Sequence, residues 1–296
     1  MHEDRPSSTA ALIAAVTVFL ERDPRLAGLV PAGAAPLCAR CLESLSLRRA
    51  VDALSTPALR WAARLAEHAT VPGLLLHFML RKRWIEEAVR AALAEGCAQV
   101  VVIGAGFDTL AARLSPEFPG AAFLEIDHPA TQARKRAALV SAPVNLRFVA
   151  ADLARVRLQD ALSADGALRP GARSVFVIEG LLMYLSDAEV ASVFAALREV
   201  ARAGGRVVFT VMEPTRDGRS AFHNATPLVT RLLARWSEPF KSALGRDDAA
   251  RFLERFGFHL RSRADSETLR AAYLAPARLE SLALARGELI VVAESS

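Results

Sequence analysis

The sequence predicts an α/β fold, a doubly wound and mostly parallel seven-stranded sheet with a helical N-terminal extension and lid insertions. Two observations lead to this prediction. From residue 99 onward, apolar runs alternate with helical patterns, and each run is nearly free of polar residues. Strands that are apolar on both faces are typical of parallel sheets that are covered by helices on either side.

The first part of the chain is predicted to be helical. Residues 9–95 show a repeated Ala/Leu/Arg periodicity and contain no convincing strand. Prolines interrupt this periodicity and divide it into several helices. We therefore expect a helical extension or cap over residues 1–95 and a ligand-binding domain over residues 96–296. The interrupting prolines are Pro24, Pro31, Pro36, Pro57 and Pro72.

The second part supplies the sheet. Seven strands are predicted, with helices between them that begin near Asp108, Pro129 and Ser186 and near residue 247. Residues 214–245 lie between two of these strands, and their polar, turn-rich start predicts a lid that closes over a substrate. The strands are expected in residues 99–106, 121–127, 145–152, 174–180 and 206–214, near 259–265, and in 288–294.

The charge pattern argues against nucleic-acid and membrane partners. Lys and Arg number 37 against 32 Asp and Glu, but the basic residues are scattered and form no concentrated stripe. The apolar run at residues 10–20 follows no basic leader and is too short to span a bilayer. We expect a soluble, cytoplasmic protein with a small-molecule substrate and no nucleic-acid or membrane partner.

The three cysteines predict neither a disulfide framework nor a metal site. Cys38 and Cys41 form a CxxC pair, but Cys97 is the only other cysteine, and zinc would require two more soft ligands. The pair lies in a helical stretch, whereas redox CxxC motifs usually follow a strand. We interpret Cys38 and Cys41 as small packing residues one helical turn apart.

Glycines and carboxylates stand at the carboxyl ends of four successive predicted strands. The first strand ends in Gly104 and Gly106, and the next three end in acids. Ligands of open parallel sheets bind outside these strand ends, whereas a purely structural sheet gains nothing from acids there. The sequence therefore predicts a ligand site at this edge. The acids are Glu125 and Asp127, Asp152, and Glu179.

A nucleoside accounts for this arrangement. Asp127 lies 21 residues after Gly106, a spacing typical of an acid that binds ribose hydroxyls. Asp152 could accept a hydrogen bond from the amino group of adenine, and the glycines allow the backbone to approach the ligand. Asp108 is positioned to cap the following helix and to place polar atoms near the ligand.

Two nucleoside cofactors and a non-catalytic role compete at this point. A nicotinamide dinucleotide needs a third glycine at the helix start, but Thr109 stands there and Asp108 would repel a phosphate. S-adenosylmethionine has no phosphate and carries a cationic sulfonium, so the carboxylates favour it. A nicotinamide-dependent oxidoreductase and a non-catalytic cofactor-binding partner protein remain open as alternatives.

The motifs also resemble a known family. VVIGAGFDTLAARL, FLEIDHPATQARKRAAL, FVAADL and VFVIEGLLMYLSDAEV, with LRKRWIEEAV upstream, resemble the leucine carboxyl methyltransferase-like branch of class I S-adenosylmethionine-dependent methyltransferases. This branch includes bacterial polyketide-type O-methyltransferases. The resemblance implies a Rossmann-like fold and S-adenosylmethionine as the cofactor. The sequence also departs from the family pattern, because the tryptophan that often follows the Asp-Leu pair is missing here.

The resemblance assigns roles to individual positions. Arg81 would pair with the cofactor's methionine carboxylate, with Arg83 as an alternative, and Glu179 would lie near its amino group. Asp108 offers polar atoms near the amino-acid portion of the cofactor. The remaining assignments are Gly104 and Gly106 beside the methionine and ribose, Asp127 at the ribose, and Asp152 with Leu153 at the adenine.

The expected reaction is O-methylation of a small-molecule acceptor in secondary metabolism. A carboxylate acceptor needs no general base, and no His/Asp pair is evident near the core motifs, so we expect a methyl ester product. No catalytic residue is assigned. The candidates are Tyr184, which is interpreted first as a packing residue, and His223 in the lid. The aromatic residues Phe222, Trp236 and Phe240 could form an acceptor pocket or part of the core.

Overall fold

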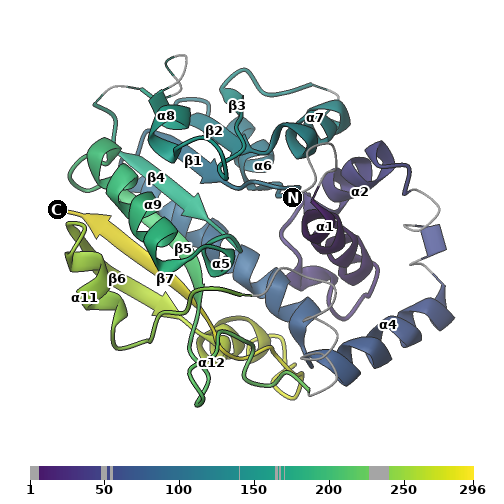
Figure 1. The fold of residues 1–296 in the computed structure, drawn as a ribbon. Helices are drawn as coiled ribbons and strands as arrows, with labels where there is room; N and C mark the ends of the chain where they lie inside the picture. The colour runs from purple at the N-terminus through teal and green to yellow at the C-terminus, as the bar shows by residue number, and fades with distance from the viewer. Residues whose placement is uncertain are drawn as a thin grey trace. The chain divides into compact units, whose positions relative to one another are not determined.

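A computed structural model shows all seven predicted strands in one sheet (Figure 1). The model describes residues 7–47, 52–53, 56–139, 141–163, 166, 168–169, 171–226 and 240–296. The strand order is β3-β2-β1-β4-β5-β7-β6. The strands are β1 (Gln99–Ile103), β2 (Ala122–Asp127), β3 (Leu146–Ala150), β4 (Ser174–Ile178), β5 (Arg206–Met212), β6 (Phe258–Ala264) and β7 (Glu288–Ser295).

The pairing confirms a mostly parallel sheet. Strand β1 pairs in parallel with β2 and β4, and β2 pairs in parallel with β3. The last strand is the exception, because β7 pairs antiparallel with both β5 and β6. Every residue of β1, β4 and β5 is buried, as the continuous apolar runs predict for strands covered on both faces.

The chain divides into two compact units, which are described in turn. The first comprises Met1–Trp61 and Val89–Val177, and the second comprises Ala62–Ala88 and Ile178–Ser296. The helices α4 (Pro57–Thr70) and α5 (Leu74–Ala94) have residues in both units. The predicted domain boundary at residues 95/96 stays a prediction.

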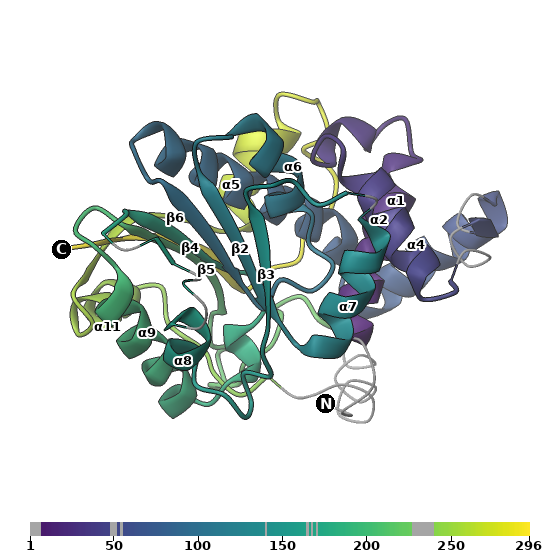
Figure 2. The ribbon, with the colours of Figure 1, turned by 90° about the horizontal axis from the view of Figure 1, so that it is seen from above.

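The first unit holds β1 to β3, most of β4, and a group of helices. Helices α1 and α2 pack on each other, and α2 also packs on α7 (Figure 2). The α1 helix starts beside α7, because the Ser7 backbone N–H donates to Thr131 Oγ1 over 3.1 Å. The helices are α1 (Ser8–Glu21), η1 (Ala27–Leu29), α2 (Ala34–Ser44), α6 (Leu110–Glu117), α7 (Pro129–Ala138) and α8 (Leu158–Ser163).

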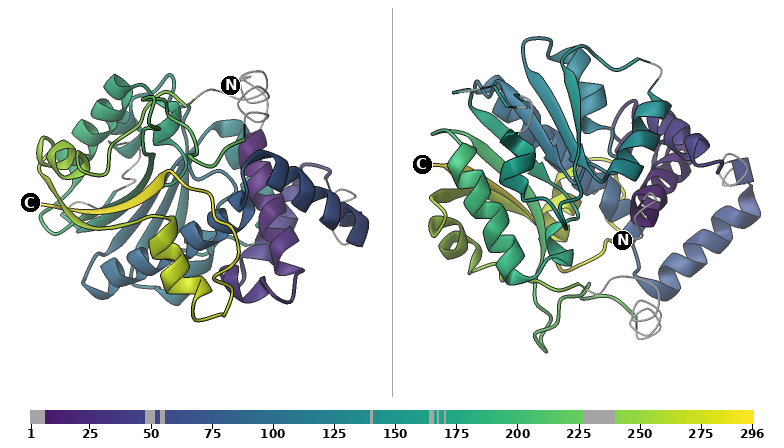
Figure 3. Two further views of the ribbon diagram at one scale, coloured as in Figure 1. Left: turned by 90° about the horizontal axis from the view of Figure 1, so that it is seen from below. Right: turned by 45° about the horizontal axis from the view of Figure 1, so that its top comes forward.

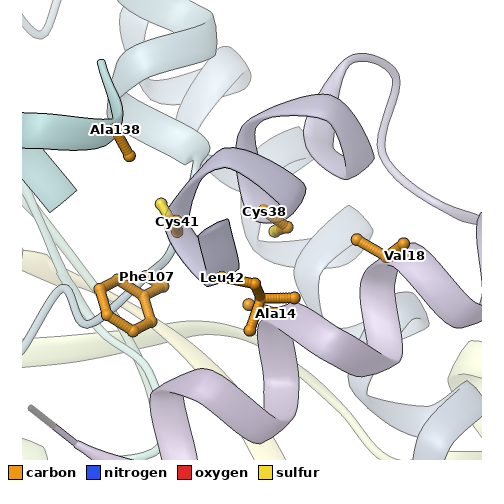
Figure 4. Close-up of a cluster of buried hydrophobic side chains, with 7 residues drawn as sticks. All are labelled: Ala14, Val18, Cys38, Cys41, Leu42, Phe107 and Ala138. Carbon is orange, nitrogen blue, oxygen red and sulfur yellow. The ribbon is translucent and has the colours of Figure 1, made fainter. Parts of the chain in front are cut away.

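The two cysteines of the CxxC pair lie in an apolar cluster of the first unit. Figure 4 shows Cys38 and Cys41 on α2, with Phe107 from the loop after β1 close by. Burial raises the pKa of the Cys41 thiol to about 11, which removes the thiolate that redox chemistry and metal binding require. The structure therefore gives these residues a packing role. The other members of the cluster are Ala14, Val18, Leu42 and Ala138.

The second unit is built around β5, β6 and β7, which lie side by side (Figure 3). The Phe194 ring on α9 meets Phe209 of β5 edge-on, with 5.1 Å between ring centroids, and does the same with Phe252 at 4.9 Å. This aromatic contact joins α9 to the sheet. The unit also contains η3 (Leu182–Tyr184), α9 (Asp187–Val200), α11 (Ala249–Glu254), α12 (Ser266–Leu269) and η4 (Arg270–Leu274).

Helix starts follow the predicted capping residues. The Ser186 side chain and Glu189 form a reciprocal capping box at the start of α9. Pro129 is the first residue of α7, where its missing N–H is no loss. The α9 helix ends at Val200, and a turn that contains Gly204 and Gly205 leads into β5.

Candidate active site

The loop after β1 brings the backbone close to its neighbours. Gly104 and Gly106 both have positive φ, at 68° and 51°, which explains why the strand ends in glycines. A Cβ on Gly106 would come within 3.1 Å of the Ala10 Cβ, so the start of α1 lies against this loop. The Asp108 carboxylate accepts the Leu110 N–H over 2.8 Å. The N-cap residue of α6 is Thr109, so the prediction that Asp108 is the N-cap was wrong by one residue.

Asp127 lies next to this loop at the end of β2. Its carboxylate accepts the backbone N–H groups of Gly106 and of His128, the second over 2.5 Å. Burial raises the pKa of Asp127, and these two hydrogen bonds oppose that effect. The structure thus brings together the predicted ribose acid and the second predicted glycine.

Asp152 lies beyond the end of β3, two residues after Ala150, which is in register with Asp127. Its Oδ1 accepts the Ala154 N–H over 3.0 Å. Its Oδ2 lies 3.9 Å from Nε2 of His128. The His128 and Asp152 side chains therefore meet, although no His/Asp pair was evident from the sequence. At 3.9 Å the two groups are near each other but beyond hydrogen-bond distance, and the register of β2 and β3, rather than chain position, sets this distance.

Glu125, the other acid of β2, is engaged inside the first unit. Its carboxylate lies 2.5 Å from Nζ of Lys135 on α7, and both side chains are buried. Burial raises the pKa of Glu125, and the Lys135 charge opposes the shift. A buried pair of this kind holds α7 to β2 and gives Glu125 a partner other than a ligand.

In the second unit, Arg81 on α5 is buried between two carboxylates. Its Nε and Nη2 donate to Glu179 Oε1 over 3.0 and 2.8 Å, and its Nη1 donates to both carboxylate oxygens of Glu288 over 2.8 and 3.1 Å. Lys82 donates to the other Glu179 oxygen over 3.1 Å. Arg81 and Glu179 were predicted to lie at the site, and they contact each other.

The side chains of Arg81 and Arg83 contact different residues in the structure. The Arg83 guanidinium carbon lies 4.7 Å from the ring centroid of Tyr273, whereas Arg81 contacts Glu179. Burial alone would lower the pKa of Arg81, but the charges of Glu288 and Glu179 raise it. Of the two arginines, Arg81 is therefore the one that the structure places with a predicted site residue.

Sequence reasoning missed Glu288 and His77. Glu288 is the first residue of β7 and lies opposite Met212, the last residue of β5. Because β7 is antiparallel, its first residue lies at the edge where its parallel neighbours end. His77 Nε2 lies 2.8 Å from Glu288 Oε2, and both side chains are buried. The sequence did contain a signal for Glu288, because this acid begins a final strand that is otherwise largely apolar.

Tyr184, the first candidate catalytic residue, packs beside a row of aromatic rings. Tyr184 meets Phe240 edge-on at 5.4 Å between centroids, and Phe240 meets Phe222 at 6.1 Å. The Phe222 ring in turn meets the His77 ring at 6.5 Å. The structure brings Phe222 and Phe240 together, and Trp236 lies outside the described residues. That these rings form an acceptor pocket stays a prediction. A catalytic role for Tyr184 stays a prediction.

His223 packs against the chain before β7. A Cβ on Gly287 would come within 2.6 Å of the His223 ring, and His223 Nε2 lies 3.3 Å from the carbonyl oxygen of Glu213. The neighbouring Asn224 donates to the carbonyl oxygens of Pro72 and Leu284. These contacts fix residues 223–224 in place, and the catalytic role of His223 stays a prediction.

Two further features concern the part of the chain that the structure describes. Within them, no group of His, Cys, Asp and Glu side chains is arranged to hold a metal ion. No helix in that same part of the chain is long and apolar enough to cross a membrane.

Comparison with known sequences identifies relatives for most of the chain. The family model of leucine carboxyl methyltransferase matches residues 9–198. A Bacillus subtilis protein named "Putative S-adenosyl-L-methionine-dependent methyltransferase YktD" is 28% identical over 204 residues, which cover 67% of this chain and 64% of that protein. A Mycobacterium bovis protein with the same description, without the suffix, is 33% identical over 59% of this chain and 50% of its own length. The chain thus spans between half and two thirds of these relatives.

Solved structures with the same fold extend over a similar share of the chain. A protein described as a putative methyltransferase from Thermobifida fusca superimposes with a TM-score of 0.56 at 20% identity, covering 87% of this chain and 94% of its own. A DUF574 family protein from Streptomyces avermitilis gives a TM-score of 0.57 at 19% identity, with 75% and 85% covered. The fold is the Rossmann-like fold of class I methyltransferases, as predicted. With its motifs, sheet order and family match taken together, the chain belongs to the leucine carboxyl methyltransferase family.

Proposed function

We propose that the protein is an S-adenosylmethionine-dependent O-methyltransferase. The observation that carries this proposal is the group formed by the Gly104–Gly106 loop, Asp127 and Asp152 in the first unit. Asp127 offers carboxylate oxygens to ribose hydroxyls. Asp152 offers an acceptor to the adenine amino group, and the Leu153 N–H, which has no partner among the described residues, offers a donor to the ring nitrogen beside it.

The same group disfavours a dinucleotide. A pyrophosphate would need the free N–H groups at the start of α6, but the Asp108 carboxylate already accepts the Leu110 N–H there. A second anion beside Asp108 would also be repelled. S-adenosylmethionine avoids both difficulties, since it has no phosphate.

Within the second unit, Arg81 and Glu179 form a pair of opposite charges. Glu179 can accept hydrogen bonds from an ammonium group, and Arg81 can donate to a carboxylate. Both side chains are held by partners within their own unit, Glu179 by Arg81 and Lys82 and Arg81 also by Glu288. A zwitterion matches such a pair of opposite charges.

When bound, the cofactor supplies an electrophilic methyl group. For that transfer, the protein has to align an acceptor oxygen and exclude water. We propose a carboxylate acceptor from secondary metabolism, because a carboxylate is ionised at neutral pH and needs no base. The half-buried rings of Tyr184, Phe240 and Phe222 meet edge-on, and such an apolar surface suits the carbon skeleton of an acceptor.

The acceptor class can be tested on the product. The full chain is incubated with methyl-labelled S-adenosylmethionine and matched acceptors that differ only in bearing a carboxyl, a phenol or an alcohol. We expect label in the carboxyl compounds, released as volatile methanol by mild base because methyl esters hydrolyse. Base-stable label in the phenols or alcohols would contradict the ester proposal and leave O-methylation standing.

A further inference from the structure

His128 connects the two acids that are proposed to bind the nucleoside. Its backbone N–H donates to Asp127 Oδ1 over 2.5 Å, and its ring Nε2 lies 3.9 Å from Asp152 Oδ2. The His128 side chain is 8% exposed and the Asp152 side chain 23%, so the imidazole is buried and the carboxylate is partly buried. One residue therefore touches both the ribose acid and the adenine acid.

The ring orientation of His128 is fixed by the start of α7. Its Nδ1 accepts the Ala130 N–H over 3.3 Å, which makes His128 the N-cap of that helix. A neutral imidazole that accepts at Nδ1 carries its proton on Nε2. The N–H of His128 therefore faces the Asp152 carboxylate and opposes rotation of that carboxylate.

A cation, Arg155, also approaches Asp152 and provides a comparison. Arg155 Nε lies 3.6 Å from the same Oδ2, but the Arg155 side chain is 64% exposed. Solvent screens a charge at that exposure and leaves a long side chain free to take other positions. The His128 ring is buried and held at Nδ1, so it keeps its place beside Asp152, whereas the exposed Arg155 side chain is free to leave it.

We propose that His128 is a positioning residue that makes the site specific for an adenine base. This inference rests on the proposed function. Adenine has an amino group at C6 and an acceptor at N1, which match the Asp152 carboxylate and the Leu153 N–H. Hypoxanthine has a carbonyl at C6 and a donor at N1, so both contacts are reversed. If Asp152 turns away, the site loses the group that rejects the C6 carbonyl.

The test compares binding of S-adenosylhomocysteine with binding of S-inosylhomocysteine by isothermal titration calorimetry. His128→Asn keeps an N-cap for α7, because asparagine accepts the same backbone N–H, but its side chain is too short to reach Asp152. Arg155→Gln is the matched control that removes the exposed cation. We expect His128→Asn to reduce the ratio of the two affinities by about tenfold, because the Asp152 carboxylate can then turn away from the base, and Arg155→Gln to leave it unchanged.

A second variant shows whether His128 acts through Asp152. In an Asp152→Asn background, His128→Asn is expected to change the affinity ratio by less than about twofold, because the positioned carboxylate is already gone. A tenfold loss in that background too, or an unchanged ratio in the single His128→Asn variant, would overturn the inference. If the unaltered protein binds neither nucleoside, the proposed function itself fails.

Discussion

Replacing Glu288 by alanine is expected to lower the free energy of unfolding by about 3–5 kcal/mol, because it leaves the buried Arg81 guanidinium without one of its two carboxylates. His77 loses its partner in the same change. In a chain of this size, such a loss lowers the melting temperature by roughly 10 °C. The measurement is urea and thermal unfolding followed by circular dichroism.

An exposed ion pair provides the control for this variant. Glu117 lies 2.8 Å from Arg90 with about half of its side chain exposed. The Glu117→Gln variant is expected to lose less than about 1 kcal/mol, as is usual for surface pairs. If Glu288→Ala were no more destabilised than Glu117→Gln, the buried network would not contribute to stability as described.

The contribution of Glu288 to the free energy of unfolding is expected to depend on pH. Burial would raise the pKa of Glu288, but the Arg81 charge and the His77 hydrogen bond lower it from 4.5 to about 2. Its stabilising effect is therefore complete above pH 4.5 and is lost as the pH falls toward 2. Between pH 6 and 3.5, the unaltered protein should lose about 1.4 kcal/mol more than Glu288→Gln. Equal losses would contradict the lowered pKa.

Replacing Asp127 by asparagine is expected to weaken S-adenosylhomocysteine binding by about 100-fold or more. Two ribose hydroxyls would each lose a charge-assisted hydrogen bond, and each such bond contributes about 1.5–3 kcal/mol. Asparagine has nearly the same shape and can still accept one of the N–H groups of Gly106 and His128. Calorimetric titration measures the affinity, and circular dichroism checks that the fold is kept.

A surface aspartate controls for the loss of a negative charge. Asp160 pairs with Arg157 over 2.9 Å, and half of its side chain is exposed. Asp160→Asn is expected to bind S-adenosylhomocysteine within about twofold of the unaltered protein, since long-range charge effects are screened. An affinity of Asp127→Asn within threefold of the unaltered protein would remove Asp127 from the ribose site.

The sheet could be predicted because its strands are buried on both faces. Runs such as Val100–Ile103 have no polar residue and end in glycines, and this pattern has few alternatives in a long α/β chain. The starts of α7 and α9 could be predicted for a similar reason, since Pro129 and Ser186 are local signals. The end of α9 at Val200 has no comparable local signal, because several positions before Gly204 can terminate a helix.

The candidate site could be predicted only where chain position and strand direction agree. Asp127 ends one parallel strand and Asp152 follows the next, so that rule predicts both as site residues. Glu288 begins an antiparallel strand, so the rule overlooked it although it lies opposite the end of β5. The approach of His128 to Asp152 depends on the register of β2 with β3, which pairs Asp127 with Ala150. Register is set by tertiary packing and leaves little trace in a single sequence.

The central claim is that the chain binds S-adenosylmethionine through its strand-end carboxylates. Its most direct test is a calorimetric titration of the purified full chain with S-adenosylhomocysteine, beside a parallel titration with NADH followed by nicotinamide fluorescence. We predict saturable one-to-one binding of S-adenosylhomocysteine in the micromolar range and no change in NADH fluorescence. Absence of S-adenosylhomocysteine binding, or a saturable NADH signal in its place, would contradict the assignment.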